Sequence, residues 1–138
     1  MRVFLDANIL ISVLNKEYPV FTWSARVLSL ADQKRFSFCT SAVCLAIACY
    51  FAEKKSGATV AKHKMKLLAE KILIVNVGRA EVMQAANDKR VKDFEDGMQN
   101  YAAKAAKCKC IITEDVDDFY FSDLEVLTAE QLLVKHCY

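Results

Sequence analysis

Short apolar runs alternate with longer amphipathic segments along this chain. Runs rich in Val, Ile, Leu, Phe and Cys predict strands that are buried on both faces. Segments in which apolar residues recur every three or four positions predict helices. The expected strands cover residues 3–5, 36–39, 72–77, 110–113 and 124–127, and the expected helices cover 9–14, 21–32, 42–54, 60–71, 79–87, 93–105 and the chain from 128 onward. This alternation predicts an α/β fold with a central, mainly parallel sheet flanked by helices.

The length and composition favour one globular domain, residues 1–138, with 54% hydrophobic and 26% charged residues. With 3 Gly and 1 Pro, the composition excludes disordered and all-β classes. The uncharged stretch 36–52 approaches the length of a membrane span. It is rich in Ala, Cys, Ser and Thr, and Thr40-Ser41 divides it. We therefore expect a buried strand and a buried helix there, and no membrane segment.

The six cysteines show no metal-binding or secretory pattern. There is no Cys-x-x-Cys motif, and neither histidine lies at zinc-finger spacing from a cysteine. Asp6 interrupts the first apolar run too early for a signal peptide. We expect free, largely buried thiols and a cytoplasmic protein.

Charge is unevenly distributed, although the net charge is only +2. Residues 54–71 contain six lysines and one acid, Glu70, whereas residues 114–125 contain six acids and no Lys or Arg. A basic segment and an acidic pole on a near-neutral protein favour a cation site beside a surface that follows phosphates. For the lysines alone, a solvated helix face is the alternative.

Carboxylates stand where strands end or helices begin. Asp6 ends the first apolar run, Asp93 and Asp96 open the helix at 93–105, and Asp115 and Asp118 follow the fourth strand. In parallel sheets, ligands bind at the carboxyl ends of the strands, so these acids are expected to meet at one edge. Asp6 and Asp93 also have the composition of helix N-caps, which is the structural alternative for each.

Such a cluster needs a cation. Two carboxylates about 4 Å apart repel by about 4 kcal/mol at an effective dielectric near 20. Mg²⁺ and Mn²⁺ suit carboxylate oxygens and water, and such sites hydrolyse phosphodiesters. Asp117 also has the simpler interpretation of solvated charge. A receiver-like phospho-acceptor domain is disfavoured because Val75-Asn76-Val77 supplies no acid at the end of the middle strand.

Four segments resemble the motifs of PIN-domain nucleases in order and spacing. They are residues 4–10, 93–101, 111–119 and 126–133, so the resemblance extends over almost the whole chain. It implies a PIN-like three-layer sandwich around a parallel sheet. It also implies a Mg²⁺- or Mn²⁺-dependent endoribonuclease, most often the toxin of a VapC-type toxin–antitoxin pair, with RNA as substrate, an antitoxin as partner and a homodimeric assembly.

The resemblance assigns roles by position. It implies metal-binding and catalytic acids at Asp6, Asp96 and Asp115, further metal-binding acids at Asp93 and Asp118, and polar neighbours at Asn8 and Thr113. In the basic segment, the candidates for binding RNA phosphates are Lys62, Lys64 and Lys66.

One position departs from the family pattern. Family members commonly carry a Glu a few residues after the Ser that caps the third helix, and counting from Ser41 this place falls at or near Ile47. The next acid, Glu53, lies roughly 240° further around the helix. A second hypothesis is therefore a PIN fold that binds RNA or a protein partner without cutting.

Overall fold

The computed structural model describes residues 1–137 and contains a five-stranded sheet. The strand order is β3-β2-β1-β4-β5, and every neighbouring pair is parallel. The strands are β1 (Arg2–Leu5), β2 (Ser37–Ser41), β3 (Leu73–Val75), β4 (Cys110–Ile112) and β5 (Glu125–Leu127). The α/β class and the parallel sheet that the sequence predicts are confirmed.

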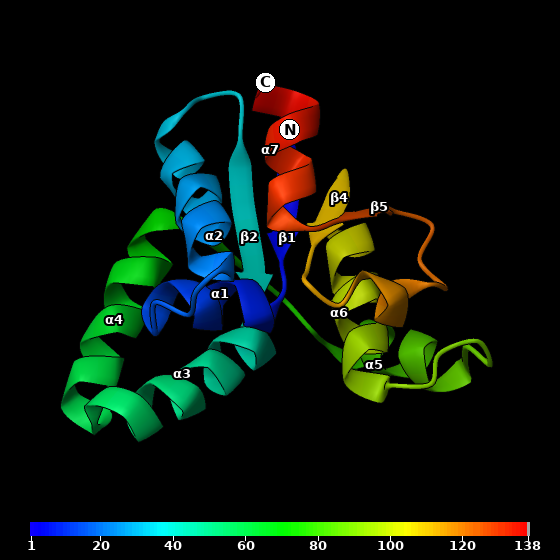
Figure 1. Cartoon of the computed structure of the whole chain (residues 1–138). Coiled ribbons are helices and arrows are strands. Elements are labelled where there is room, and N and C mark those ends of the chain that lie inside the picture. Colours follow the sequence, from blue (N-terminus) through cyan, green and yellow to red (C-terminus); the bar gives the residue numbers. More distant parts are fainter. Residues whose placement is uncertain (138) are drawn as a thin grey trace.

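Helices cover both faces of this sheet. In Figure 1, α1 to α4 gather on one side, and α5 and α6 lie on the other. The helices are α1 (Ala7–Leu14), α2 (Val20–Ser29), α3 (Ala42–Ser56), α4 (Ala58–Lys71), α5 (Arg79–Asn87), α6 (Phe94–Ala105) and α7 (Ala129–Cys137), with short 3₁₀ helices η1 (Leu30–Asp32) and η2 (Val116–Phe119). The C-terminal helix α7 packs on α2. The three-layer architecture is therefore confirmed, and η2 is the main element that the sequence pattern did not predict.

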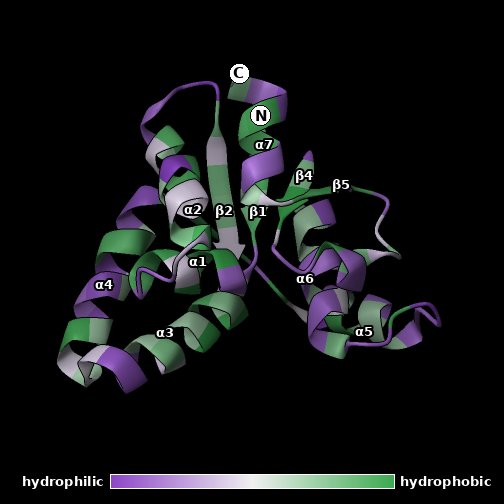
Figure 2. Ribbon diagram, in the orientation of Figure 1, coloured by the Kyte–Doolittle hydropathy of each residue, from purple (hydrophilic) through white to green (hydrophobic). Residues whose placement is uncertain are grey.

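The core is centred on β1. Val3, Phe4 and Leu5 are completely buried, and Phe4 lies in register between Cys39 of β2 and Ile111 of β4. Figure 2 shows hydrophobic or neutral colours along the central strands and hydrophilic colour in the first turn of α6. Because β1 is the middle strand of the five, the polar residue that follows it, Asp6, stands at the middle of the sheet edge.

Side-chain caps begin three helices at this edge. Asp6 accepts a hydrogen bond from the backbone N of Ala7 at 2.8 Å, and Asp93 accepts one from the backbone N of Glu95 at 2.9 Å. Ser41 caps α3 by accepting from the backbone N of Cys44. The N-cap interpretation of Asp6 and Asp93 is thus confirmed, and it places both carboxylates at the strand ends.

The uncharged stretch 36–52 forms β2 and most of α3. In the part of the chain that the structure describes, no helix combines the length and the apolarity needed to cross a membrane. All six cysteines are free thiols, and Cys39 and Cys108 place their Sγ atoms 3.3 Å apart in the core. The expected buried strand and free thiols are confirmed, but the helix is wrong as a buried one: only Cys44, Ala48 and Ala52 of α3 are buried, whereas Tyr50 and Phe51 are exposed, because one face of α3 packs on the fold and the other is open to solvent.

Candidate metal centre

A cavity of about 230 Å³ opens at the carboxyl edge of the sheet. It is lined by Asp6, Ala7, Asn8, Ile11, Ile47, Asp93, Glu95, Asp96, Asp115 and Asp118. The five acids that the sequence assigned to the site therefore lie around one cavity, although the chain separates them by up to 112 positions. The lining residues include no lysine or arginine.

Asp6 is the most buried acid of the cavity, with 5% of its surface exposed. Its Oδ2 accepts a hydrogen bond from Oγ1 of Thr113 at 2.9 Å. Burial raises the pKa of Asp6, the hydrogen bonds from Thr113 and Ala7 lower it in part, and the charge of Asp115 raises it further. The fold thus orients this carboxylate firmly but leaves its charge without a cationic partner.

Asn8 and Thr113 connect Asp6 to Asp115. The Nδ2 group of Asn8 donates to Oγ1 of Thr113 at 3.0 Å and to Oδ2 of Asp115 at 3.1 Å. The backbone N of Asp115 also donates to Oγ1 of Thr113, at 3.1 Å. These two polar residues, which the sequence predicts as neighbours of the acids, therefore hold the ends of β1 and β4 in a fixed relation.

The first turn of α6 adds Asp93 and Asp96. Oδ1 of Asp93 accepts hydrogen bonds from the backbone N atoms of both Glu95 and Asp96, so this carboxylate faces the start of the helix. Asp96 is half-buried, and burial, followed by the charges of Asp93, Asp6 and Glu95, raises its pKa to about 7. Burial is the larger cause and the neighbouring negative charges add to it, so the ionised form of Asp96 is disfavoured when no cation is nearby.

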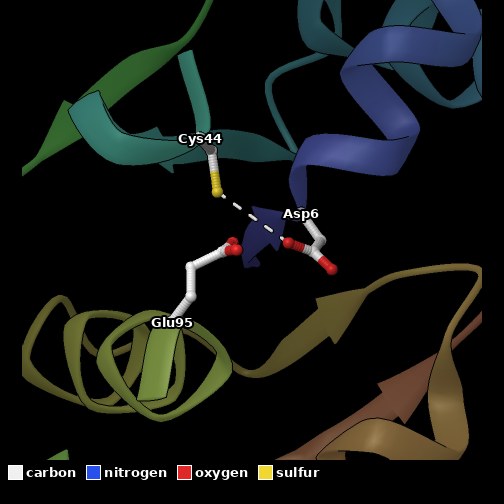
Figure 3. Close-up of side chains that lie close together, drawn as sticks. All are labelled: Asp6, Cys44 and Glu95. Atoms are coloured by element: carbon white, nitrogen blue, oxygen red, sulfur yellow. Dashed lines mark hydrogen bonds between the residues drawn. The ribbon is translucent and has the colours of Figure 1, made fainter. Parts of the chain in front are cut away.

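Glu95 is a member of the cavity that the sequence assignment did not include. Figure 3 shows Asp6, Cys44 and Glu95 converging from the end of β1, from α3 and from α6. Their ligand atoms all lie within 4.8 Å of one another. Burial, with the charges of Asp6 and Asp93, raises the pKa of Glu95. Its place between Asp93 and Asp96 was the available signal, but how far the side chain reaches depends on tertiary packing.

The α3 wall of the cavity has no carboxylate among the described residues. Ile47 lines the cavity, which is the direction the sequence count from Ser41 gave to this position. Cys44, one turn earlier, is completely buried, and its thiol donates to Oδ1 of Asp6 at 3.8 Å. Glu53 is exposed and lies outside the lining, as its helical angle predicts.

The three candidate lysines lie on α4, away from this lining. Lys62 and Lys66 are exposed, as a phosphate-binding face requires. Lys64 instead donates from Nζ to the backbone O of Leu14 at 2.9 Å, near the C-terminus of α1. The structure therefore gives Lys64 a structural contact that the charge pattern did not predict.

The donor set of the cavity suits a hard divalent cation. Six carboxylates and no cationic side chain line it, and oxygen donors of this kind bind Mg²⁺ or Mn²⁺ with part of their water shell retained. Burial, followed by the charges of neighbouring acids, raises the pKa values of Asp6, Glu95 and Asp96, and no lysine or arginine of the lining opposes this shift. The residues present therefore fit the cation that the acidic pattern predicts.

Comparison with solved structures shows the same fold. The chain is similar to VapBC2 from Rickettsia felis bound to a promoter DNA fragment, with a TM-score of 0.69, 16% identity and coverage of 92% of this chain and 97% of that one. It is also similar to VapBC-1 from nontypeable Haemophilus influenzae, with a TM-score of 0.70, 17% identity and coverage of 94% of this chain and 99% of that one. A third similar structure is Mycobacterium tuberculosis VapC20, a toxin that cleaves the sarcin-ricin loop, with a TM-score of 0.70, 17% identity and coverage of 90% of this chain and 98% of that one.

Sequence comparison identifies the family. No curated protein matches the chain significantly. The family model described as PIN domain matches residues 2–117, which include the end of β1, the first turn of α6 and the end of β4. This match covers most of the chain and agrees with the fold shared with the VapC structures. The chain therefore belongs to the PIN domain family.

Proposed function

We propose that this protein is a Mg²⁺- or Mn²⁺-dependent endoribonuclease that hydrolyses phosphodiester bonds of RNA. The observation that carries the proposal is the cavity at the sheet edge, where carboxylates from β1, α6 and the end of β4 meet without a lysine or arginine in the lining. Membership of the PIN domain family supports the same assignment.

In this proposal, Asp6, Asp96 and Asp115 hold the cation, and Asp93 and Asp118 complete the acidic surround. When bound, a divalent cation there supplies Lewis-acid stabilisation of phosphate charge and makes water a better nucleophile. Thr113 and Asn8 keep the Asp6 and Asp115 carboxylates in fixed positions through the hydrogen bonds described above. Because burial and then the charge of Asp93 raise the pKa of Asp96 to about 7, this carboxylate is partly protonated at neutral pH and would release that proton on binding a cation.

We further propose that the protein is the toxin of a toxin–antitoxin pair and acts in the cytoplasm. The similarity to the VapBC structures supports an antitoxin partner whose inserted segment blocks the acidic cavity. A homodimer is also proposed. The exposed apolar residues Leu73 (48% exposed) and Ile74 (40% exposed) on edge strand β3 offer surface for it to bury. Light scattering that shows only a monomer at high micromolar concentration would contradict the dimer.

RNA binding is proposed for the lysine-bearing face of α4. Lys62 and Lys66 are exposed there, whereas the part that Lys64 plays is limited by its bond to Leu14. Each lysine that contacts a single-stranded phosphate contributes roughly 0.7 to the slope of log affinity against log salt. The double variant Lys62→Ala/Lys66→Ala is therefore expected to lower that slope by about 1.4.

The direct test is cleavage of single-stranded RNA by the purified protein with Mn²⁺ and with a chelator. We expect cleavage only with Mn²⁺, and its loss in Asp96→Asn. Asp117→Asn is the matched control, because Asp117 is an exposed acid of η2 outside the cavity lining. Cleavage in chelator, or an active Asp96→Asn enzyme, would contradict the assignment.

A second function, RNA or protein binding without cutting, is favoured by one observation. Ile47 places an apolar side chain in the wall of the cavity, and α3 adds no carboxylate to the lining. A protein that binds RNA with salt-dependent affinity but leaves it intact in excess Mn²⁺ would establish this alternative.

A further inference from the structure

The inner wall of the cavity is built differently from its outer rim. Asp115 and Asp118 are exposed, whereas Asp6 and Cys44 are buried. On the inner side, α3 places Ile47 in the lining and Cys44 beside Asp6, and neither residue is a carboxylate. A cation bound at the inner side of the cavity would therefore lie near the Asp6 carboxylate and, on the α3 side, near the Cys44 thiol and the apolar Ile47 side chain.

Glu95 reaches this inner wall from the opposite helix. It starts in the first turn of α6 and extends toward Cys44 and Asp6, as Figure 3 shows. The ligand atoms of the three residues lie within 4.8 Å of one another, and Glu95 is only partly exposed. Since Glu95 also lines the cavity itself, its carboxylate faces the same space as Asp96 and Asp115.

A buried hydrogen-bond chain fixes the distance between α3 and α6. The backbone N of Cys44 donates to Oγ of Ser41 at 3.1 Å, and the same Oγ donates to Oε1 of Gln99 at 2.6 Å. Gln99 is completely buried on α6, one turn beyond Glu95. The approach of Glu95 to Cys44 is therefore constrained by the buried bond between the N-cap of α3 and Gln99 of α6.

Cys44 supports this arrangement without supplying charge. Its thiol donates toward Oδ1 of Asp6 at 3.8 Å, so it is oriented as a hydrogen-bond donor to the neighbouring carboxylate. Gln99 keeps its Nε2 group without a hydrogen-bond partner among the described residues, which leaves a further buried donor on the same helix. The inner wall thus has donors but only two carboxylates, Asp6 and Glu95.

We propose that Glu95 is a direct ligand of the divalent cation, paired with Asp6 on the α3 side of the cavity. It supplies from α6 the carboxylate that α3 does not provide. This inference rests on the proposed metal centre and adds to it one named ligand, with oxygen chemistry that suits Mn²⁺ or Mg²⁺.

The test is calorimetric titration of Mn²⁺ into the full chain at a fixed pH near 8. We expect Glu95→Gln to weaken Mn²⁺ binding by roughly tenfold to a hundredfold, the range typical when groups that fix a metal site are removed. Asp117→Asn, which removes one exposed negative charge outside the lining, should bind within about twofold of the wild type because exposed charges are screened. Thermal melting in chelator checks folding, and Glu95→Gln should melt at or above the wild-type temperature because carboxylate repulsion is relieved.

A second variant separates ligation from a simple field effect. Glu95→Asp keeps the charge but shortens the side chain by one methylene, so a ligand would be withdrawn from the cation while the field remains. We expect Glu95→Asp to weaken binding nearly as much as Glu95→Gln. Wild-type affinity in either Glu95 variant would overturn the inference while leaving the metal centre intact. Absence of saturable Mn²⁺ binding in the wild type would overturn both.

Discussion

Two charged regions of this molecule are handled in opposite ways by the fold. Around the acidic cavity, Asp6 and Asp96 have raised pKa values because burial and like charges surround them without a cationic partner. Along α3 and α4, several of the lysines contact groups within the chain, whereas Lys62 and Lys66 are exposed. Lys64 and Lys55 donate to backbone carbonyls at the end of α1, and Lys54 lies 4.4 Å from the centre of the Tyr50 ring.

The difference shows which charge pattern requires a ligand. A lysine that caps a helix C-terminus has its charge balanced by the helix dipole and needs nothing from outside. Clustered carboxylates at helix N-termini are balanced only in part, since each dipole offsets a fraction of the repulsion among six acids. The two charge patterns are equally clear in the sequence, but the acidic residues are gathered around one cavity with no lysine or arginine in its lining, whereas part of the lysine charge is used in contacts within the chain.

The largest expected effect comes from Asp6→Asn. Asn keeps one oxygen, which can accept from the backbone N of Ala7, but it replaces the oxygen that accepts from Thr113 with an amide NH₂ group and removes the buried negative charge. We expect cleavage of single-stranded RNA in Mn²⁺ to fall at least about a hundredfold, a loss of roughly 3 kcal/mol in transition-state stabilisation. The melting temperature should change little. Wild-type turnover in Asp6→Asn would remove the acidic cavity from the mechanism.

A smaller effect is expected where the cavity wall is apolar. Ile47→Glu places a carboxylate on α3 beside the cavity, so Mn²⁺ should bind several-fold more tightly than in the wild type. In chelator the variant should melt at a lower temperature, because a partly buried apolar residue becomes charged. Mn²⁺ should recover most of that loss by binding only the folded state. Equal destabilisation with and without Mn²⁺ would show that residue 47 does not reach the cation.

The effect of Asp96 on the stability of the folded protein depends on pH. Burial, then Asp93, raises its pKa to about 7 in the folded protein, above the ordinary value of 3.8. The favourable contribution of its protonated form to stability is therefore complete below about pH 4 and is lost as the pH rises through about 7. In chelator, Asp96→Asn should melt above the wild type at pH 8 and close to it at pH 4.

The size of this difference is modest because Asp96 is half-exposed. Solvent screening reduces the effect to about 1 kcal/mol, equivalent to roughly 4 °C in melting temperature for a domain of this size. Thermal melts of both proteins at pH 4, 6 and 8 check the trend. If the difference in melting temperature between the wild type and Asp96→Asn does not change with pH, Asp96 is not the group whose pKa the fold raises.

The smallest expected effect lies in the basic region. Lys64→Met removes the donor to Leu14 and should lower the free energy of unfolding by about 0.5 to 1 kcal/mol. Lys62→Met, two positions earlier on α4 at an exposed site, should change the free energy of unfolding by less than about 0.5 kcal/mol. Denaturant unfolding of both variants measures the difference. If the two variants are equally stable, the bond from Lys64 to α1 contributes nothing and the lysines form one solvated face.

Most of the fold could be predicted from the sequence because its signals are local. A strand buried on both faces, such as β1, must be continuously apolar, and a capping residue such as Asp93 marks where a helix begins. The bounds of β3 differ from those that the sequence predicts. The expected strand 72–77 is reduced to Leu73–Val75, since an apolar run does not distinguish a central strand from an exposed edge strand.

The site was predictable only as far as backbone position determines it. Asp6 comes immediately after β1, and Asp115 comes three residues after the end of β4. Because the two strands are parallel neighbours, the meeting of these acids at one edge could be inferred. The approach of Glu95 to Cys44 could not. It depends on the spacing between α3 and α6, which a buried bond between Ser41 and Gln99 sets across 58 positions of sequence. The bond from Lys64 to Leu14 likewise depends on how α4 packs beside α1.

The most direct test of the account is a titration of Mn²⁺ into the wild-type protein at pH 8, followed by its melting temperature. If the acidic cavity holds charge that the fold leaves unbalanced, Mn²⁺ should bind saturably and raise the melting temperature. At a hundredfold excess over the dissociation constant, the free energy of unfolding should increase by about 2.7 kcal/mol. Asp6→Asn should show little of this increase. A wild-type protein whose melting temperature is unchanged by Mn²⁺ would contradict the central claim.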